Sequence, residues 1–200
     1  MPMEKFTFPG HSGDRLAARL DLPEGPHLGT ALFAHCFTCG KDIHAARRIA
    51  QRLSAMGIAV LRFDFTGLGH SGGEFENTSF SSNVADLVTA ARHLADRGMA
   101  PGLLIGHSLG GAAVLKAAAE IPSALAVVTL AAPYDPAHVT RNFAVAHPRL
   151  HGDGSMQVDL AGRTVTLGRD FLRDVTEANL GPAIRDLNRA LLIMHAPRDA

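Results

Sequence analysis

The sequence has no excess of either charge, no long apolar run and only two cysteines. Nineteen basic and nineteen acidic side chains cancel, so charge favours neither nucleic acid nor an anionic membrane as a partner. No stretch approaches the ~20 apolar residues of a membrane span, and the first residues lack the apolar core of a signal peptide. Two cysteines are too few for a disulfide framework and agree with a reducing compartment. The sequence therefore predicts a cytoplasmic protein without a membrane span.

What the sequence does contain is an alternation of strand and helix patterns over 200 residues, a length that suits one domain with a substantial core. An antiparallel hairpin is predicted from residues 5–8 and 16–22. Continuous apolar runs predict strands covered on both faces, at 30–35, 58–63, 103–105, 124–130 and 191–195. Helical spacing of apolar residues predicts helices at 44–57, 82–97 and 111–120. This order predicts an α/β fold, with a mostly parallel sheet and helices on both faces.

The five residues Gly106 to Gly110 read Gly-His-Ser-Leu-Gly and stand between an apolar run and a helix-forming run. A G-x-S-x-G in that position is typical of a nucleophile elbow, a strained turn that exposes the serine at the top of a sheet. The following helix would present N–H groups and its positive dipole end to a developing anion. We therefore predict Ser108 to be a nucleophile; the alternative is an ordinary glycine-rich turn.

The connection between residues 132 and 189 breaks the alternation. It is far longer than the roughly 12–15 residues beyond which a connection is usually functional or disordered. Within it, residues 156–160 and 164–167 predict a small hairpin around a glycine turn, and residues 170–180 a short helix; residues 182–189 are a candidate for another. Because this segment follows a strand of the main sheet, we expect residues 133–189 to form a lid over Ser108.

Taken together, these features resemble the α/β-hydrolase superfamily over essentially the whole chain. Residues 33–38, Phe-Ala-His-Cys-Phe-Thr, are similar to the family's strand ending in His-Gly, whose following loop supplies an oxyanion-hole N–H; Cys36 stands where glycine is usual. The resemblance implies a serine hydrolase that cleaves an ester, thioester or amide through an acyl-enzyme. It also implies that the N–H groups of Phe37 and Leu109 bind the oxyanion.

Residues 64–71, Asp-Phe-Thr-Gly-Leu-Gly-His-Ser, are similar to the D-x-x-G-x-G-x-S loop of the lipase-like and peptidase-like branches of this family. The two glycines permit a tight turn, and the carboxylate of Asp64 can cap loop N–H groups. We expect Asp64 to have this structural role, with catalysis as the less favoured alternative.

Residues 193–199, Ile-Met-His-Ala-Pro-Arg-Asp, resemble the strand and loop that deliver the catalytic acid in this family, which implies Asp199. The alternative acid is Asp135, because some branches place the acid after the earlier strand. The family's chain order is nucleophile, acid, histidine, and only Ala200 follows Asp199. We therefore expect the 200 residues to be the front part of a longer domain, with the base histidine after Ala200 and little activity in residues 1–200 alone. Some bacterial proteins that this chain resembles carry an osmotically inducible, thiol-peroxidase-like domain after the hydrolase.

Three alternatives to this chemistry remain at the level of sequence. Cys36 and Cys39 form a C-x-x-C, a redox signature near a strand-to-helix junction, although two small residues that shape the oxyanion loop are the favoured interpretation. Histidines and aspartates of the 133–189 segment match no tight zinc spacing, so we predict neither a metal nor a cofactor; these residues are Asp135, His138, His147, His151 and Asp153. If the complete gene lacks a downstream histidine, the fold would serve as a non-catalytic binding module. Otherwise we predict a small-molecule acyl substrate.

Overall fold

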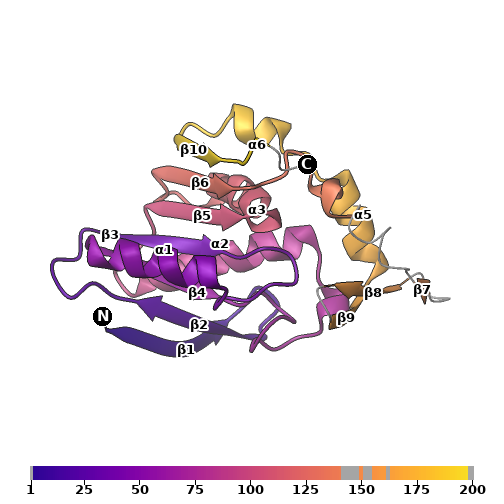
Figure 1. Ribbon diagram of the computed structural model, residues 1–200, viewed down its shortest axis with the longest axis horizontal. Coiled ribbons are helices and arrows are strands. Elements are labelled where there is room, and N and C mark those ends of the chain that lie inside the picture. The colour runs from indigo at the N-terminus through magenta and orange to yellow at the C-terminus, as the bar shows by residue number, and fades with distance from the viewer. Residues whose placement is uncertain (1, 141–148, 151–154, 161–162, 198–200) are drawn as a thin grey trace.

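The computed structural model describes residues 2–140, 149–150, 155–160 and 163–197, and a seven-stranded sheet runs through its centre (Figure 1). The strand order is β1-β2-β4-β3-β5-β6-β10. The strands are β1 (Met3–Pro9), β2 (Arg15–Asp21), β3 (Gly29–Ala34), β4 (Ile58–Phe63), β5 (Leu103–His107), β6 (Ala126–Leu130) and β10 (Ala190–Met194). Strands β1 and β2 form an antiparallel hairpin, and β2 also pairs antiparallel with β4. The remaining pairs of this sheet are parallel. The predicted sheet, with its antiparallel start, is confirmed.

Alternate residues of β3 show that both faces of the sheet are covered. Ala31 and Phe33 pack with Ala46 and Ala50 of α1 (His44–Ala55), whereas Leu32 belongs to a larger core on the opposite face. That core is completed by α2 (Phe80–Asp96) and α3 (Leu109–Ala117). Successive side chains of a strand point to opposite faces, so an unbroken apolar run is what a strand between two helical layers requires.

Residues 133–189 add a second, three-stranded antiparallel sheet and short helices. Their elements are η3 (Pro136–Thr140), β7 (Arg149–Leu150), β8 (Met156–Leu160), β9 (Arg163–Leu167), α5 (Arg169–Glu177) and α6 (Gly181–Arg185). The predicted hairpin is confirmed, because β8 and β9 pair with Met156 opposite Leu167. Figure 1 shows β8, β9 and α5 on the side of the molecule toward which the arrows of β3 and β5 point.

The inserted segment shares the main core rather than forming its own. Buried apolar side chains of β9 and α5, including Leu167 and Phe171, belong to the same cluster as α2 and α3. The carboxylate of Asp174 on α5 accepts hydrogen bonds from the backbone N and hydroxyl of Ser81 on α2, at 2.6 and 2.8 Å. The segment is therefore docked on α2 and on η1 (Phe75–Asn77).

In the part of the chain that the structure describes, we find no helix with both the length and the apolar character that crossing a bilayer requires. The edge strand β10 exposes four large apolar side chains, from Leu191 to Met194.

Candidate active site

The carboxyl ends of four neighbouring parallel strands meet at one edge of the sheet. Ala34 at the end of β3 pairs with Gly106 of β5, and the N–H of Ala131 after β6 donates to the carbonyl of Met194 at the end of β10, at 2.8 Å. Ligands of open α/β sheets bind at this edge. The order of the strands places the predicted nucleophile, after β5, between the predicted oxyanion loop, after β3, and the described residues that follow β6 and β10, one of which is Asp135.

Ser108 sits between β5 and α3 with φ 54° and ψ −125°. This positive φ is rare for a residue with a side chain and costs on the order of 1–3 kcal/mol. Two backbone hydrogen bonds of 2.8 Å hold it: the N–H of Ser108 donates to Leu130, and the carbonyl of Ser108 accepts from Gly111. The strand, strained turn and helix are the local structure that a nucleophile elbow requires.

The elbow glycines are required because backbones approach each other closely. A Cβ on Gly106 would lie 2.3 Å from the carbonyl oxygen of Gly110, and a Cβ on Gly110 would lie 2.3 Å from the carbonyl oxygen of His35. No side chain fits at these distances. The absence of side chains lets the first turn of α3 lie directly against the end of β3.

Phe37 and Leu109 are brought together by this close approach. Both line a small cavity of about 10 Å³, together with His35, Cys36 and Gly110 among others. A volume of that size accommodates about one water-sized group. Leu109 opens α3, so its N–H is one of those that a helix start leaves without an intrahelical partner.

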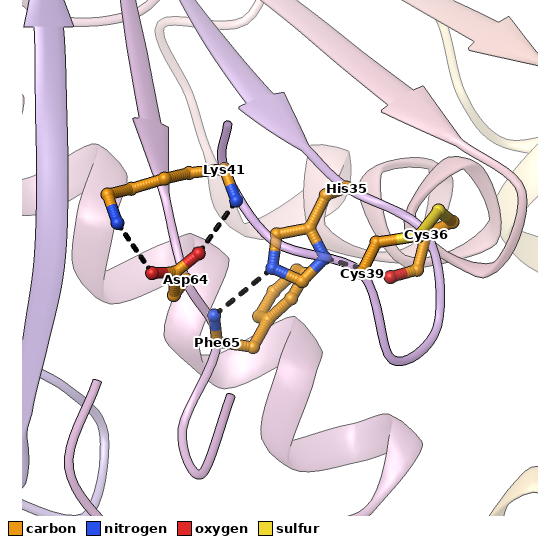
Figure 2. Close-up of a disulfide and its surroundings, with 6 residues drawn as sticks. All are labelled: His35, Cys36, Cys39, Lys41, Asp64 and Phe65. Atoms are coloured by element: carbon orange, nitrogen blue, oxygen red, sulfur yellow. Dashed lines mark hydrogen bonds and ion pairs between the residues drawn. A yellow bond between two sulfur atoms is a disulfide. The ribbon is translucent and has the colours of Figure 1, made fainter. Parts of the chain in front are cut away.

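His35 orients the loop that follows β3 (Figure 2). Its Nε2 accepts a hydrogen bond from the N–H of Phe65 at 3.4 Å, so the ring proton is on Nδ1, which donates to the carbonyl of Cys36 at 2.8 Å. Burial lowers the pKa of His35 and keeps the ring neutral, as this pattern needs. The N–H and C=O of a trans peptide point in opposite directions, so the N–H of Phe37 points away from the His35 ring.

Asp64 ties the same loop to the loop after β4. Its carboxylate is buried and accepts from the N–H and the ammonium of Lys41, both at 2.6 Å, and from the N–H of His70 at 3.0 Å. Burial raises the pKa of Asp64, but the hydrogen bonds from Lys41 and His70 outweigh it and hold the pKa below its usual value. The predicted capping of loop N–H groups is observed. No sequence pattern indicated the role of the buried Lys41, because no motif spacing links it to Asp64.

Cys36 and Cys39 are joined by a disulfide, with their Cα atoms 5.3 Å apart. The sequence contained the signal for this pair, although shaping of the loop by two small residues was the favoured interpretation. The four residues form a turn in which the N–H of Cys39 donates to the carbonyl of Cys36 at 3.1 Å.

An aromatic cluster connects the loop after β3 with the inserted segment, and sequence reasoning missed it. The ring of Phe37 lies 5.6 Å from that of Phe75 in η1 and 5.0 Å from that of Phe171 in α5, between ring centroids. Contacts between residues so far apart in the chain have no signature in local periodicity.

Of the two candidate acids, Asp199 lies outside the described residues. Asp135 is exposed, and its carboxylate accepts from the N–H of Ala137 at 3.0 Å, which caps η3. His147, His151 and Asp153 also lie outside the described residues. Elsewhere in the described chain, no group of three or more histidine, cysteine, aspartate or glutamate side chains is arranged to hold a metal ion.

Comparison with known proteins adds a family and several relatives. The family model described as serine aminopeptidase, S33, matches residues 32–166. A monoacylglycerol lipase of Mycolicibacterium smegmatis is 30% identical over 140 residues, 67% of this chain and 48% of the lipase. The chain thus spans about half the length of the curated relative it matches.

Solved structures agree with this family. The esterase domain of a Rhodothermus marinus protein is 46% identical, with a TM-score of 0.76 over 98% of this chain and 77% of that one. Est1E from Butyrivibrio proteoclasticus, solved with ferulic acid bound, has 22% identity and a TM-score of 0.78 over 94% of this chain and 77% of Est1E. At that identity Est1E supports the fold alone.

Proposed function

Because this chain belongs to the serine aminopeptidase S33 family of α/β-hydrolases, we propose that it supplies the nucleophile and the oxyanion hole of a serine hydrolase that works through an acyl-enzyme. The observation that carries the proposal is the strained conformation of Ser108 at a strand-to-helix turn. Strain of this kind is retained where function requires the exposed hydroxyl.

In the proposed reaction, the Oγ of Ser108 attacks the substrate carbonyl carbon while a histidine takes the hydroxyl proton. The N–H groups of Phe37 and Leu109 stabilise the negative oxygen of the tetrahedral intermediate, by about 3 kcal/mol per donor. Collapse of the intermediate transfers the proton to the leaving group and leaves the acyl group on Ser108. Water, activated by the same histidine, then releases the acid.

We place the acid of the triad at Asp199, with Asp135 as the alternative, and the histidine downstream of the acid. This assignment follows the family's chain order. Its direct test is to replace each aspartate by asparagine in the natural full-length protein. The Asp199→Asn variant is expected to lose about 10⁴-fold in kcat, as the equivalent change does in a serine protease, while Asp135→Asn stays within a few-fold of wild type; the reverse result would exchange the two roles.

An uncharged carboxylic ester is the proposed substrate class, ahead of a thioester or an amide. The curated relative is a monoacylglycerol lipase and the 46%-identical structure is an esterase domain. We also propose that residues 133–189 act as a lid that shapes the acyl pocket. Support comes from the contact of Phe171 on α5 with Phe37 in the loop that carries the proposed oxyanion donor.

Labelling with a fluorophosphonate probe tests the mechanism. The natural full-length protein is expected to be labelled at Ser108 and to hydrolyse a p-nitrophenyl ester. The Ser108→Ala variant should lose both properties, and the control Ser12→Ala, at an exposed turn of the β1-β2 hairpin, should keep both. A folded protein whose Ser108 stays unlabelled would favour the non-catalytic binding module instead.

We further propose a cytoplasmic location, where the Cys36–Cys39 disulfide would be exposed to cellular dithiols. Cell fractionation tests this point.

A further inference from the structure

The disulfide between Cys36 and Cys39 has no part in the proposed hydrolysis, yet it encloses the peptide that carries one of the proposed oxyanion donors. Both cysteines are half-buried and therefore partly open to solvent. Together with Phe37 and Thr38 they form the turn between β3 and α1. The redox state of two sulfurs therefore bears on the turn that contains Phe37.

Thr38 is the residue of this turn that needs support. Its φ is +57°, a conformation that a type II turn requires at its third position and that glycine usually supplies. A β-branched side chain in this region is a conformational outlier. The disulfide spans the same four residues as the turn hydrogen bond from Cys39 to Cys36, so it holds Thr38 where an open chain would tend to relax.

The two ends of the turn are held independently of the disulfide. On one side, His35 binds the carbonyl of Cys36 and the N–H of Phe65. On the other side, both nitrogens of Lys41 bind Asp64, as Figure 2 shows. Opening the disulfide would therefore leave the strand, the helix and the core in place and loosen the middle of the turn. The peptide that carries the Phe37 N–H has its carbonyl held by two hydrogen bonds, from His35 and from Cys39. Only the bond from His35 is independent of the disulfide, so reduction would weaken the hold on that peptide without abolishing it.

We propose that Cys36 and Cys39 form a reversible thiol–disulfide modification site that sets the reactivity of Ser108, with the disulfide form as the faster enzyme. The inference rests on the proposed function, because it acts through the N–H of Phe37. In the modification step, a thiolate of an external dithiol attacks one sulfur and forms a mixed disulfide. The second thiol of the reagent then displaces the remaining cysteine. Two electrons and two protons pass to Cys36 and Cys39, and the dithiol becomes a disulfide.

The expected size of the effect follows from the residues involved. Loss of one oxyanion donor costs about 10²–10³ in rate, and relaxation of Thr38 would misplace the Phe37 N–H in most molecules rather than remove it. We expect acylation of Ser108 to slow by about tenfold on reduction, which corresponds to about 1.4 kcal/mol.

The test compares the rate of fluorophosphonate labelling of Ser108 in the natural full-length protein before and after treatment with dithiothreitol. Free thiols are counted with a chromogenic disulfide to establish the redox state, and far-UV circular dichroism establishes that the fold is kept. Wild type should label about tenfold more slowly when reduced and should recover on reoxidation. The Cys36→Ser/Cys39→Ser variant should label slowly with or without dithiothreitol.

Thr38→Gly provides the discriminating variant, because glycine adopts a positive φ without strain. Its turn should hold its shape without the disulfide, so reduction is expected to slow labelling by no more than about twofold. Equal labelling rates for oxidised and fully reduced wild type would overturn the inference. So would a Thr38→Gly variant whose labelling slows on reduction by the same factor as that of wild type. A Ser108 that is unlabelled in both redox states would overturn the proposed function instead.

Discussion

Thr38, Ser108 and Ala131 carry side chains at positive φ, and each follows one of three neighbouring parallel strands, β3, β5 and β6. Such residues cost on the order of 1–3 kcal/mol each and persist only where the surrounding structure determines them. For Ser108 and Ala131 the surroundings are backbone hydrogen bonds from one strand end to the next, to Leu130 and to Met194. For Thr38 they are the turn and the disulfide between Cys36 and Cys39. The candidate site is thus the part of the sheet where local preference is overruled by long-range pairing.

The strain at Ser108 predicts an unusual order of stability for two inactive variants. The free energy of unfolding of Ser108→Gly should be about 1 kcal/mol greater than that of Ser108→Ala, because glycine adopts φ 54° without strain and alanine does not. Urea denaturation measures the difference. As a control, the exposed Lys116 in α3 should give the ordinary order, with Lys116→Ala about 1 kcal/mol more stable than Lys116→Gly. If Ser108→Ala is also more stable than Ser108→Gly, the elbow is not strained.

The buried pair of Lys41 and Asp64 predicts a large loss when one partner is removed. Lys41→Met leaves the Asp64 carboxylate buried with only backbone donors, and we expect the free energy of unfolding to fall by about 3–5 kcal/mol. The double variant with Asp64→Asn should lose less than the sum of the two single variants. Lys116→Met is the control and should change stability by no more than about 0.5 kcal/mol. Additive losses in the denaturation series would show that the two side chains are not coupled.

At the scale of elements, α5 connects the inserted segment with α2, with η1 and with the loop after β3. Its Phe171 is buried between the loop after β3 and η1, at 5.0 Å from Phe37 and 6.5 Å from Phe75 between ring centroids. Its Asp174 binds the start of α2. The same helix therefore contacts the loop that carries a proposed oxyanion donor, and a change in its packing should reach the candidate site.

Phe171→Ala is expected to lower the free energy of unfolding by about 3 kcal/mol, through lost apolar burial and the cavity left behind. It should also raise KM more than it lowers kcat if α5 shapes the acyl pocket without contacting the reacting atoms. Arg173→Ala on the exposed side of the same helix is the control. It should leave the free energy of unfolding and the ester kinetics nearly unchanged, since a surface ion pair contributes little. Unchanged ester kinetics in a folded Phe171→Ala protein would argue against a lid role for α5.

At the scale of the whole molecule, stability should fall as the solution becomes mildly acidic. Burial lowers the pKa of His35, and burial together with the Arg97 charge lowers that of His93. Below the unfolded value of 6.5, the unfolded chain therefore binds protons that the folded chain does not bind, and unfolding is favoured. For the fully buried His35 the loss between pH 7.5 and 5.5 is at most about 1.4 kcal/mol.

Urea denaturation at the two pH values checks this expectation. The amide of His35→Asn can still donate to the carbonyl of Cys36. Between pH 7.5 and 5.5, the free energy of unfolding of this variant should fall by about 1 kcal/mol less than that of wild type. His44→Asn, at an exposed position of α1, is the control and should follow wild type. A His35→Asn slope equal to that of wild type would mean that His35 takes up its proton in the folded state as readily as in the unfolded state.

Local periodicity and short motifs were enough to predict the succession of strands and helices along the chain, the elbow at Ser108 and the family. The sequence also indicated the C-x-x-C and the capping role of Asp64. Three contacts became visible only in the folded chain: Phe37 and Leu109 line one cavity, Lys41 pairs with Asp64 across 23 residues, and Phe171 contacts Phe37. The physical reason is that these contacts are made where strand ends converge, and convergence depends on the order and register of the sheet rather than on any neighbouring residues in the chain.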